Sequence, residues 1–132
     1  MNLRLLAVFL AVAVCACTSL SATKATNLAG KEICIVDNPS VRQVFRQAYE
    51  NQIRAKGYDT KVVADKGACP LTTTYEASYG FHWGVYLSSA DLKLFNQGTE
   101  VGSATYKAPF ASPEKHGRVE DKIAAMVAKM FP

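Results

Sequence analysis

The sequence lacks a hydrophobic run long enough to cross a membrane. Its longest apolar stretch extends only from Leu5 to Ala16, whereas a spanning helix needs about 20 apolar residues to cross roughly 30 Å of hydrocarbon. A dense basic cluster is missing too, because the formal charge is +4 over 132 residues and the lysines and arginines are scattered. Nucleic acid is therefore not an expected partner.

Known catalytic and cofactor motifs are also missing. The chain has no Gly-x-Ser-x-Gly elbow, no His-Glu-x-x-His pair and no phosphate loop, and Asp37-Asn38-Pro39 lacks the glycines of a dinucleotide fingerprint. Neighbouring Glu120 and Asp121 would point in different directions on a helix and suit its N-terminal dipole instead. We expect no catalytic residue, no cofactor and no metal site.

What is present is the composition of a folded globular protein. Apolar residues make up 49% of the chain, charged residues 20% and aromatic residues 10%, which is unlike a disordered or fibrous sequence. The length is that of one small domain.

The N-terminus has the pattern of a secretory signal, with Arg4 before the apolar stretch and polar residues after it. Its end, Val14-Cys15-Ala16-Cys17, resembles the lipobox of bacterial lipoproteins, in which Gly or Ala precedes the cysteine that becomes acylated. Cys15 is a rival site, but it would put Val14 in the position that requires a small residue. We therefore assign residues 1–16 to the signal and lipidation to Cys17; an ordinary cleaved signal with two idle cysteines is the alternative.

The lipobox resemblance implies a diacylglycerol and an N-acyl chain, such as palmitate, and two or more chains give stable anchoring. Thr18, rather than Asp, resembles lipoproteins that are sent to the outer membrane, so the expected location is that membrane, with the domain facing the periplasm. Residues 18–27 are small and polar. We expect residues 17–30 to hold the acylated cysteine and a flexible tether, which at ten residues would reach about 20 Å, and residues 31–132 to form the domain.

Hydrophobic periodicity predicts an α+β domain with a four- to five-stranded mixed sheet and two helices on one face, in the order β-α-β-β-β-(β)-α. The expected strands are 31–36, 60–64, 72–81, 86–95 and 99–106, and the expected helices follow Asn38-Pro39 and span 114–131. The first helix joins two strands that should be parallel, by a right-handed crossover. Asn38 is expected to cap this helix and Val44 to lie on its apolar face.

Cys34 and Cys69 are the two cysteines of the expected domain. The periplasm oxidises thiols, so we expect these two to form a disulfide. A redox or metal pair is the alternative, but it would need Cys-x-x-Cys spacing or nearby histidines, and neither is present.

The run from Lys31 to Pro39, Cys69 before a Thr-Thr-Thr-Tyr strand, and the hairpin from Ala90 to Ala104 resemble a group of short Gram-negative outer-membrane lipoproteins without an assigned activity. The resemblance covers nearly the whole mature chain. It implies an envelope lipoprotein with a paired Cys34 and Cys69, and it brings no catalytic residue.

Aromatic residues gather around one bend, flanked by two glycines. The candidate contact residues there are Tyr79, Phe81, His82, Trp83 and Tyr86. They could anchor a protein partner, or line a pocket in which rings stack on a ligand; the structural alternative is that Phe81 and Trp83 cover the core or the edge of the sheet. His116 is expected to be a solvated loop residue.

The function expected from these features is that of a membrane-anchored, non-enzymatic envelope lipoprotein that binds or scaffolds another envelope component. The alternative is a small-ligand binder or enzyme with a pocket at the bend from Phe81 to Trp83. The identity of a partner cannot be read from the sequence.

Overall fold

The computed structural model describes residues 19–26, 28, 30–109 and 113–132. The expected signal and Cys17 lie outside these residues. The strands are β1 (Ser19–Thr23), β2 (Glu32–Val36), β3 (Asp59–Val63), β4 (Leu71–Phe81), β5 (Val85–Asn96) and β6 (Thr99–Lys107). The helices are α1 (Gln43–Ala55) and α2 (Val119–Met130), with short 3-10 turns η1 (Lys66–Ala68) and η2 (Pro113–His116).

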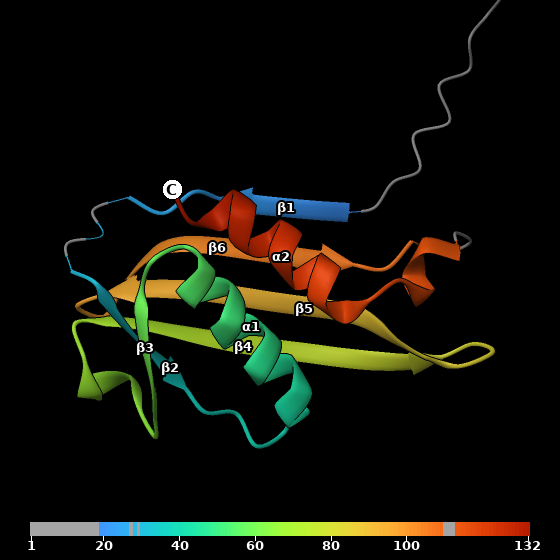
Figure 1. The fold of residues 1–132 in the computed structure, drawn as a ribbon, viewed down its shortest axis with the longest axis horizontal. Helices are drawn as coiled ribbons and strands as arrows, with labels where there is room; N and C mark the ends of the chain where they lie inside the picture. Colours follow the sequence, from blue (N-terminus) through green and yellow to red (C-terminus); the bar gives the residue numbers. More distant parts are fainter. Residues whose placement is uncertain (1–18, 27, 29, 110–112) are drawn as a thin grey trace, which may run out of the picture.

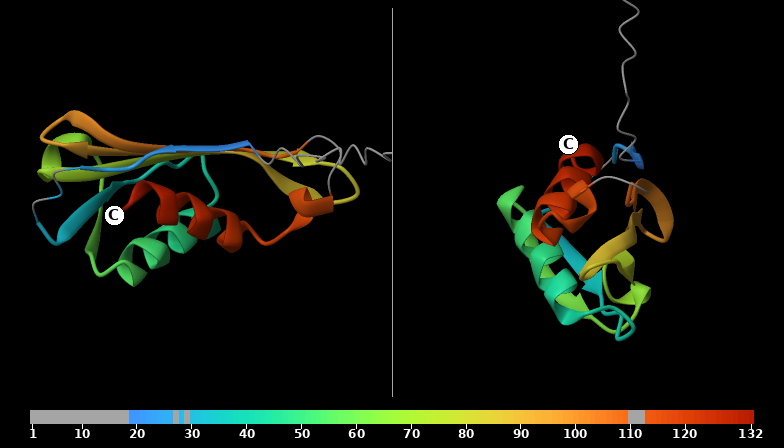
Figure 2. Two further views of the ribbon diagram at one scale, coloured as in Figure 1. Left: turned by 90° about the horizontal axis from the view of Figure 1, so that it is seen from above. Right: turned by 90° about the vertical axis from the view of Figure 1, so that its right-hand side faces the viewer.

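The fold is a small α+β domain in which one six-stranded mixed sheet carries two α-helices on one face (Figures 1 and 2). The strand order is β1-β6-β5-β4-β2-β3. The parallel pairing of β2 and β3 across α1 confirms the expected crossover, while β4, β5 and β6 form an antiparallel meander. The α+β class and the two helices on one face confirm the prediction, and the sheet has one strand more. The second helix begins at Val119 rather than at residue 114.

The additional strand is β1, which lies within the segment expected to be a flexible tether. It pairs antiparallel with β6, with Ser19 opposite Lys107 and Thr23 opposite Ser103. The chain then stays on the domain, because Ala25 is buried and its N–H donates to the carbonyl of Met130 at 2.7 Å. The expectation of a flexible tether is therefore wrong for these residues, since backbone pairing to β6 fixes a segment that has little apolar surface of its own.

The core lies between the sheet and the helices. It is built from β-branched and other large apolar side chains that are fully buried, among them Ile33, Ile35, Phe45, Ile53, Leu92, Leu94, Ile123, Met126 and Met130. Alternation along the strands sends these side chains to the helical face, and three- and four-residue spacing does the same along the helices. No helix of the described residues has the length and apolar character to cross a bilayer.

The start of α1 differs from the expectation. The N-cap is Arg42 rather than Asn38, and the side chain of Asn38 serves a turn instead, because it accepts from the N–H of Ser40 and donates to the carbonyl of Tyr75. The helix therefore begins at Gln43. Val44, expected on the apolar face, is 62% exposed. The helix ends as expected, with Gly57 at φ 96°.

Candidate functional site

The connection between β4 and β5 carries the two most exposed large apolar side chains of the described residues, Trp83 and Phe81. We call residues 81–85 the tip. Phe81 is 79% exposed, Trp83 92% and Val85 54%. The tip projects beyond the helices at one end of the long axis (Figure 1). The structural alternative, in which Phe81 and Trp83 cover the core or the edge of the sheet, is thereby excluded.

Trp83 has an unusual backbone as well as an exposed ring. Its φ is 58°, in the left-handed region that favours glycine or asparagine. The turn is closed by the N–H of His82, which donates to the carbonyl of Gly84 at 2.9 Å. A tryptophan at this position costs backbone strain and gains no burial, so the needs of folding do not explain it. Strain of this kind points to a function.

The base of the tip is a column of rings. The Tyr86 ring lies over Gly80, where an added Cβ would be 2.7 Å from it. His116 of η2 contacts Tyr86 with centroids 5.6 Å apart and stacks on His82 at 6.2 Å, and His82 meets Trp83 edge-on at 6.1 Å. The column ties the tip to η2. His116 is exposed but belongs to this column, which the sequence did not indicate.

The expected contact residues thus fall into two groups. Phe81, His82 and Trp83 are exposed at the tip, while Tyr79 and Tyr86 are half-buried behind it. Arg42 lies 4.4 Å from the centroid of the Tyr79 ring. Burial raises the pKa of Tyr79, and the nearby guanidinium partly opposes that shift. Tyr79 therefore supports the fold rather than the exposed surface.

Three cavities formed by the described residues lie away from the bend. One of about 390 Å³ lies where the end of β2 meets β4 and β5, and its charged residues are Asp37, Lys66, Glu76, Asp91 and Lys93. A smaller polar one adjoins it beside Ser40 and Ser78. Neither His82 nor Trp83 lines any of the three, so they give no support to the alternative pocket at the bend.

Groups of the large cavity are engaged with their neighbours. Asp91 accepts a hydrogen bond from the Thr105 hydroxyl at 2.7 Å, and Lys66 lies 4.4 Å from the centroid of the Phe95 ring. Asp37 accepts from the Tyr75 hydroxyl at 3.2 Å. Both signs of charge occur in one open groove, which gives no preference for an anion or a cation.

The third cavity, of about 240 Å³, lies between β1, β6 and the first turns of α2. Leu20, Tyr106 and Lys122 are among the residues that line it. The Lys122 ammonium donates to the carbonyl of Lys115 at 2.6 Å, and burial lowers its pKa. This lysine therefore helps to fix η2 against α2, close to the base of the tip.

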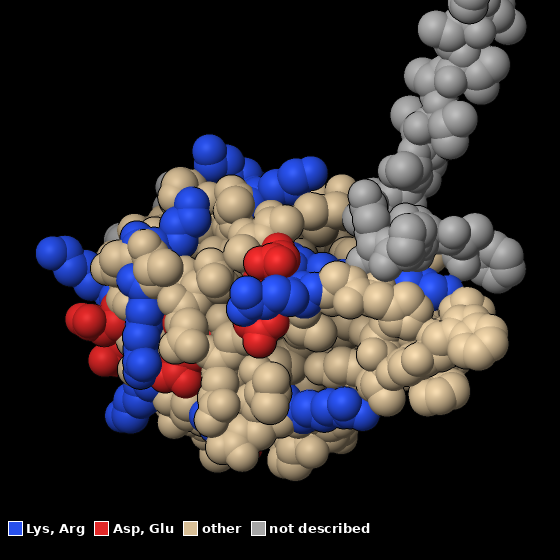
Figure 3. Space-filling view, turned by 45° about the vertical axis from the view of Figure 1, so that its right-hand side comes forward, with Lys and Arg blue, Asp and Glu red and all other residues tan. Residues whose placement is uncertain are grey.

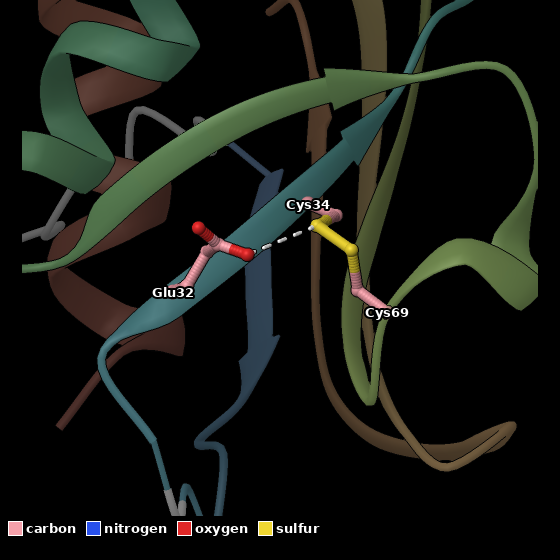
Figure 4. A group of neighbouring side chains, drawn as sticks. All are labelled: Glu32, Cys34 and Cys69. Atoms are coloured by element: carbon pink, nitrogen blue, oxygen red, sulfur yellow. Dashed lines mark hydrogen bonds between the residues drawn. A yellow bond between two sulfur atoms is a disulfide. The ribbon is translucent and has the colours of Figure 1, made fainter.

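Cys34 and Cys69 form a disulfide, as predicted (Figure 4). A carboxylate oxygen of Glu32 lies 3.9 Å from the sulfur of Cys34. These three residues are the group of possible metal ligands found among the described residues. A disulfide sulfur is not a thiolate, and the thiolate is the form that binds metal. The group is therefore a structural crosslink and not a metal centre.

Comparison with protein-family models gives no match, and comparison with curated proteins gives none. Among solved structures, the chain is similar to a PDZ domain protein from Parabacteroides distasonis ATCC 8503, with a TM-score of 0.50 and 12% identity over 86% of this chain and 34% of that one. The chain thus spans about a third of that protein, and the likeness is one of fold. It is also similar to a minor lipoprotein from Acinetobacter baumannii, with a TM-score of 0.44 and 12% identity over 79% and 92% of the two chains.

Proposed function

We propose that the mature chain is an envelope lipoprotein, anchored in the outer membrane through Cys17 with its domain facing the periplasm. In this proposal the domain acts as a non-enzymatic binding module whose contact surface is the tip. The lipobox-like run from Val14 to Cys17 supports the anchor.

The observation that carries the binding role is the exposure of Trp83 and Phe81. Isolated exposed apolar residues are ordinary, but here three stand on five consecutive residues, and apolar patches of this kind mark interaction sites. The hydrogen bond that closes the turn and the ring column behind Trp83 support this surface. A preformed surface lowers the entropic cost of binding.

A binding role accounts for the histidines better than a catalytic one. A general base is held within hydrogen-bond reach of the group whose proton it takes. The described contacts of the His82 and His116 rings are with each other and with the rings of Trp83 and Tyr86. These two side chains are therefore used as part of an aromatic support.

Photo-crosslinking in cells tests this proposal. A diazirine amino acid replaces Trp83 in one strain and Val44 in another; Val44 is also exposed and apolar, but lies on α1. We expect irradiation to give adducts, of protein or of lipid, at position 83 well above those at position 44, and we expect Cys17→Ala to abolish the excess. Equal adducts at both positions would contradict the binding role of the tip.

A further inference from the structure

The expected anchor and the tip lie at the same end of the sheet. One row of paired residues runs across four strands, from Ser19 through Lys107 and Ser89 to Ser78. The chain enters this row from Cys17, two residues earlier, whose Cα is at most about 7 Å from that of Ser19. The tip extends from β4 and β5, at the opposite end of this row from β1. It projects past the row at the end of the sheet where β1 begins. No long connection separates the anchor from the tip.

The tip reaches farther than the anchor. Phe81 lies three residues beyond Ser78 and Val85 four residues before Ser89, which at about 3.4 Å per residue places them roughly 10–14 Å beyond the row. Trp83 lies beyond both. If the strands stand upright on a bilayer that holds Cys17, the tip extends several ångström deeper than the anchor. Surface-bound apolar segments are buried about 5–10 Å into the headgroup region, so the two depths agree.

The chemistry of the tip fits a lipid surface. Trp is typical of the membrane interface, where its apolar ring and its polar N–H are both accommodated. Phe is typical of the apolar side of segments that bind a membrane surface. Exposed Lys107 stands in the row at the base of the tip. In Figure 3 the projecting end is uncharged with basic groups at its margins, and the acidic groups visible in that view lie farther toward the middle and left. Such an arrangement complements anionic headgroups.

We propose that the tip inserts into the interface of the membrane that holds Cys17, so that the domain stands on the bilayer at two points. This inference rests on the proposed anchoring and adds the occupant of the tip, namely lipid rather than protein. Tyr86 and the two histidines serve as its rigid support, and Phe81, Trp83 and Val85 as the inserted residues.

Trp83 is the single tryptophan of the chain, so its fluorescence reports on the tip directly. The test reconstitutes the acylated mature protein into vesicles of phosphatidylethanolamine and phosphatidylglycerol, with and without lipids brominated high on the acyl chain. We expect an emission maximum at shorter wavelength than in water, strong loss of emission with brominated lipid, and weak quenching by acrylamide. We expect Phe81→Ser/Val85→Ser to reverse all three and Val44→Ser to leave them unchanged.

Sedimentation of the vesicles separates two failures. If the protein sediments with the vesicles but Trp83 emits as in water and is quenched by acrylamide alone, insertion is wrong while anchoring stands. If the acylated protein does not sediment, the proposed anchoring itself is wrong. An equal effect of Val44→Ser and of the tip variant would also overturn the inference, as would crosslinks from position 83 in cells that go to a protein and not to lipid.

Discussion

Ser19 lies directly opposite Lys107, at the end of the sheet from which the tip projects. This pairing brings the chain into the fold two residues after the expected site of acylation. A tether of ten residues would let the domain move about 20 Å from the bilayer, whereas the observed register leaves about 7 Å of chain. An anchor at Cys17, as proposed, would therefore restrict the orientation of the domain.

The choice of Cys17 as the acylated residue is tested by labelling cells with an alkynyl fatty acid. We expect Cys17→Ala to lose the label and Cys15→Ala to keep it, because Ala16 supplies the small residue that must precede the cysteine. The protein is detected by in-gel fluorescence after click reaction. Loss of label in Cys15→Ala alone would show that Cys15 is the acylated residue. Absence of label in the wild type and in both variants would show that the protein is not acylated.

Gly102 tests whether the segment after β1 belongs to the domain. An added Cβ there would lie 2.8 Å from the Cβ of Ala25 and 3.1 Å from its Cα. Ala25 cannot yield easily, because its N–H is bonded to Met130. We expect Gly102→Ala to lower the free energy of unfolding by about 1–3 kcal/mol. Gly84→Ala is the matched control, since nothing lies within 4 Å of its Cβ position. Urea unfolding of the two variants measures the difference in stability. Equal midpoints would show that Ala25 does not pack against Gly102.

The Cys34–Cys69 disulfide spans a sequence separation of 35 residues. Closing a loop of that length contributes about 3–4 kcal/mol in the chain-entropy treatment. We expect Cys34→Ala/Cys69→Ala to lower the melting temperature by roughly 12–32 °C, at about 4–8 °C per kcal/mol for a domain of about 100 residues. Thermal unfolding followed by circular dichroism measures the shift. Unchanged melting in the variant and in reduced wild type would show that the crosslink contributes little.

Tyr49 should make the domain sensitive to alkali. Full burial raises the pKa of its phenol, and the hydrogen bond with Thr73 only partly opposes this. Because the folded pKa is above the unfolded value of about 10, the stability from neutral Tyr49 is complete below pH 10 and is lost as pH rises further. We expect the free energy of unfolding of wild type to fall more steeply between pH 10 and 11 than that of Tyr49→Phe, by up to about 1.4 kcal/mol.

The Tyr49→Phe comparison is clean at neutral pH. The Thr73 hydroxyl keeps its bond to the carbonyl of Lys93, at 2.8 Å. The loss of one hydrogen bond should then cost about 0.5–1.5 kcal/mol. Parallel stability curves for the two proteins across the alkaline range would show that Tyr49 is not the group responsible.

The spacing of apolar residues predicts most of the elements of the fold, but it does not predict β1. The meander from β4 to β6 and both helices follow from spacing, because each buries a full apolar face. In β1 only Leu20 is even partly buried, so its sequence differs little from a polar linker. Its backbone is held by β6, and such pairing depends on the partner rather than on the strand's own residues.

Only part of the candidate site could be predicted from the sequence. Alternation places Phe81 on a strand face but does not tell how far that strand extends past the helices, which is what exposes it. The contact of His82 with His116 joins residues far apart in the sequence and depends on the path of η2. Asn38 does not cap α1, because its side-chain amide donates to the carbonyl of Tyr75, a residue on β4 that the sequence pattern does not connect with it.

The folded domain begins at β1, two residues after the proposed site of acylation. Amide hydrogen exchange of the mature protein tests it at residues 20–23. We expect alternate amides of this segment to be protected, because those that point toward β6 are hydrogen-bonded, while amides facing the open edge exchange freely. Exchange of every amide in the segment at the rate of an unstructured peptide, with β6 protected, would restore a flexible tether and contradict the account.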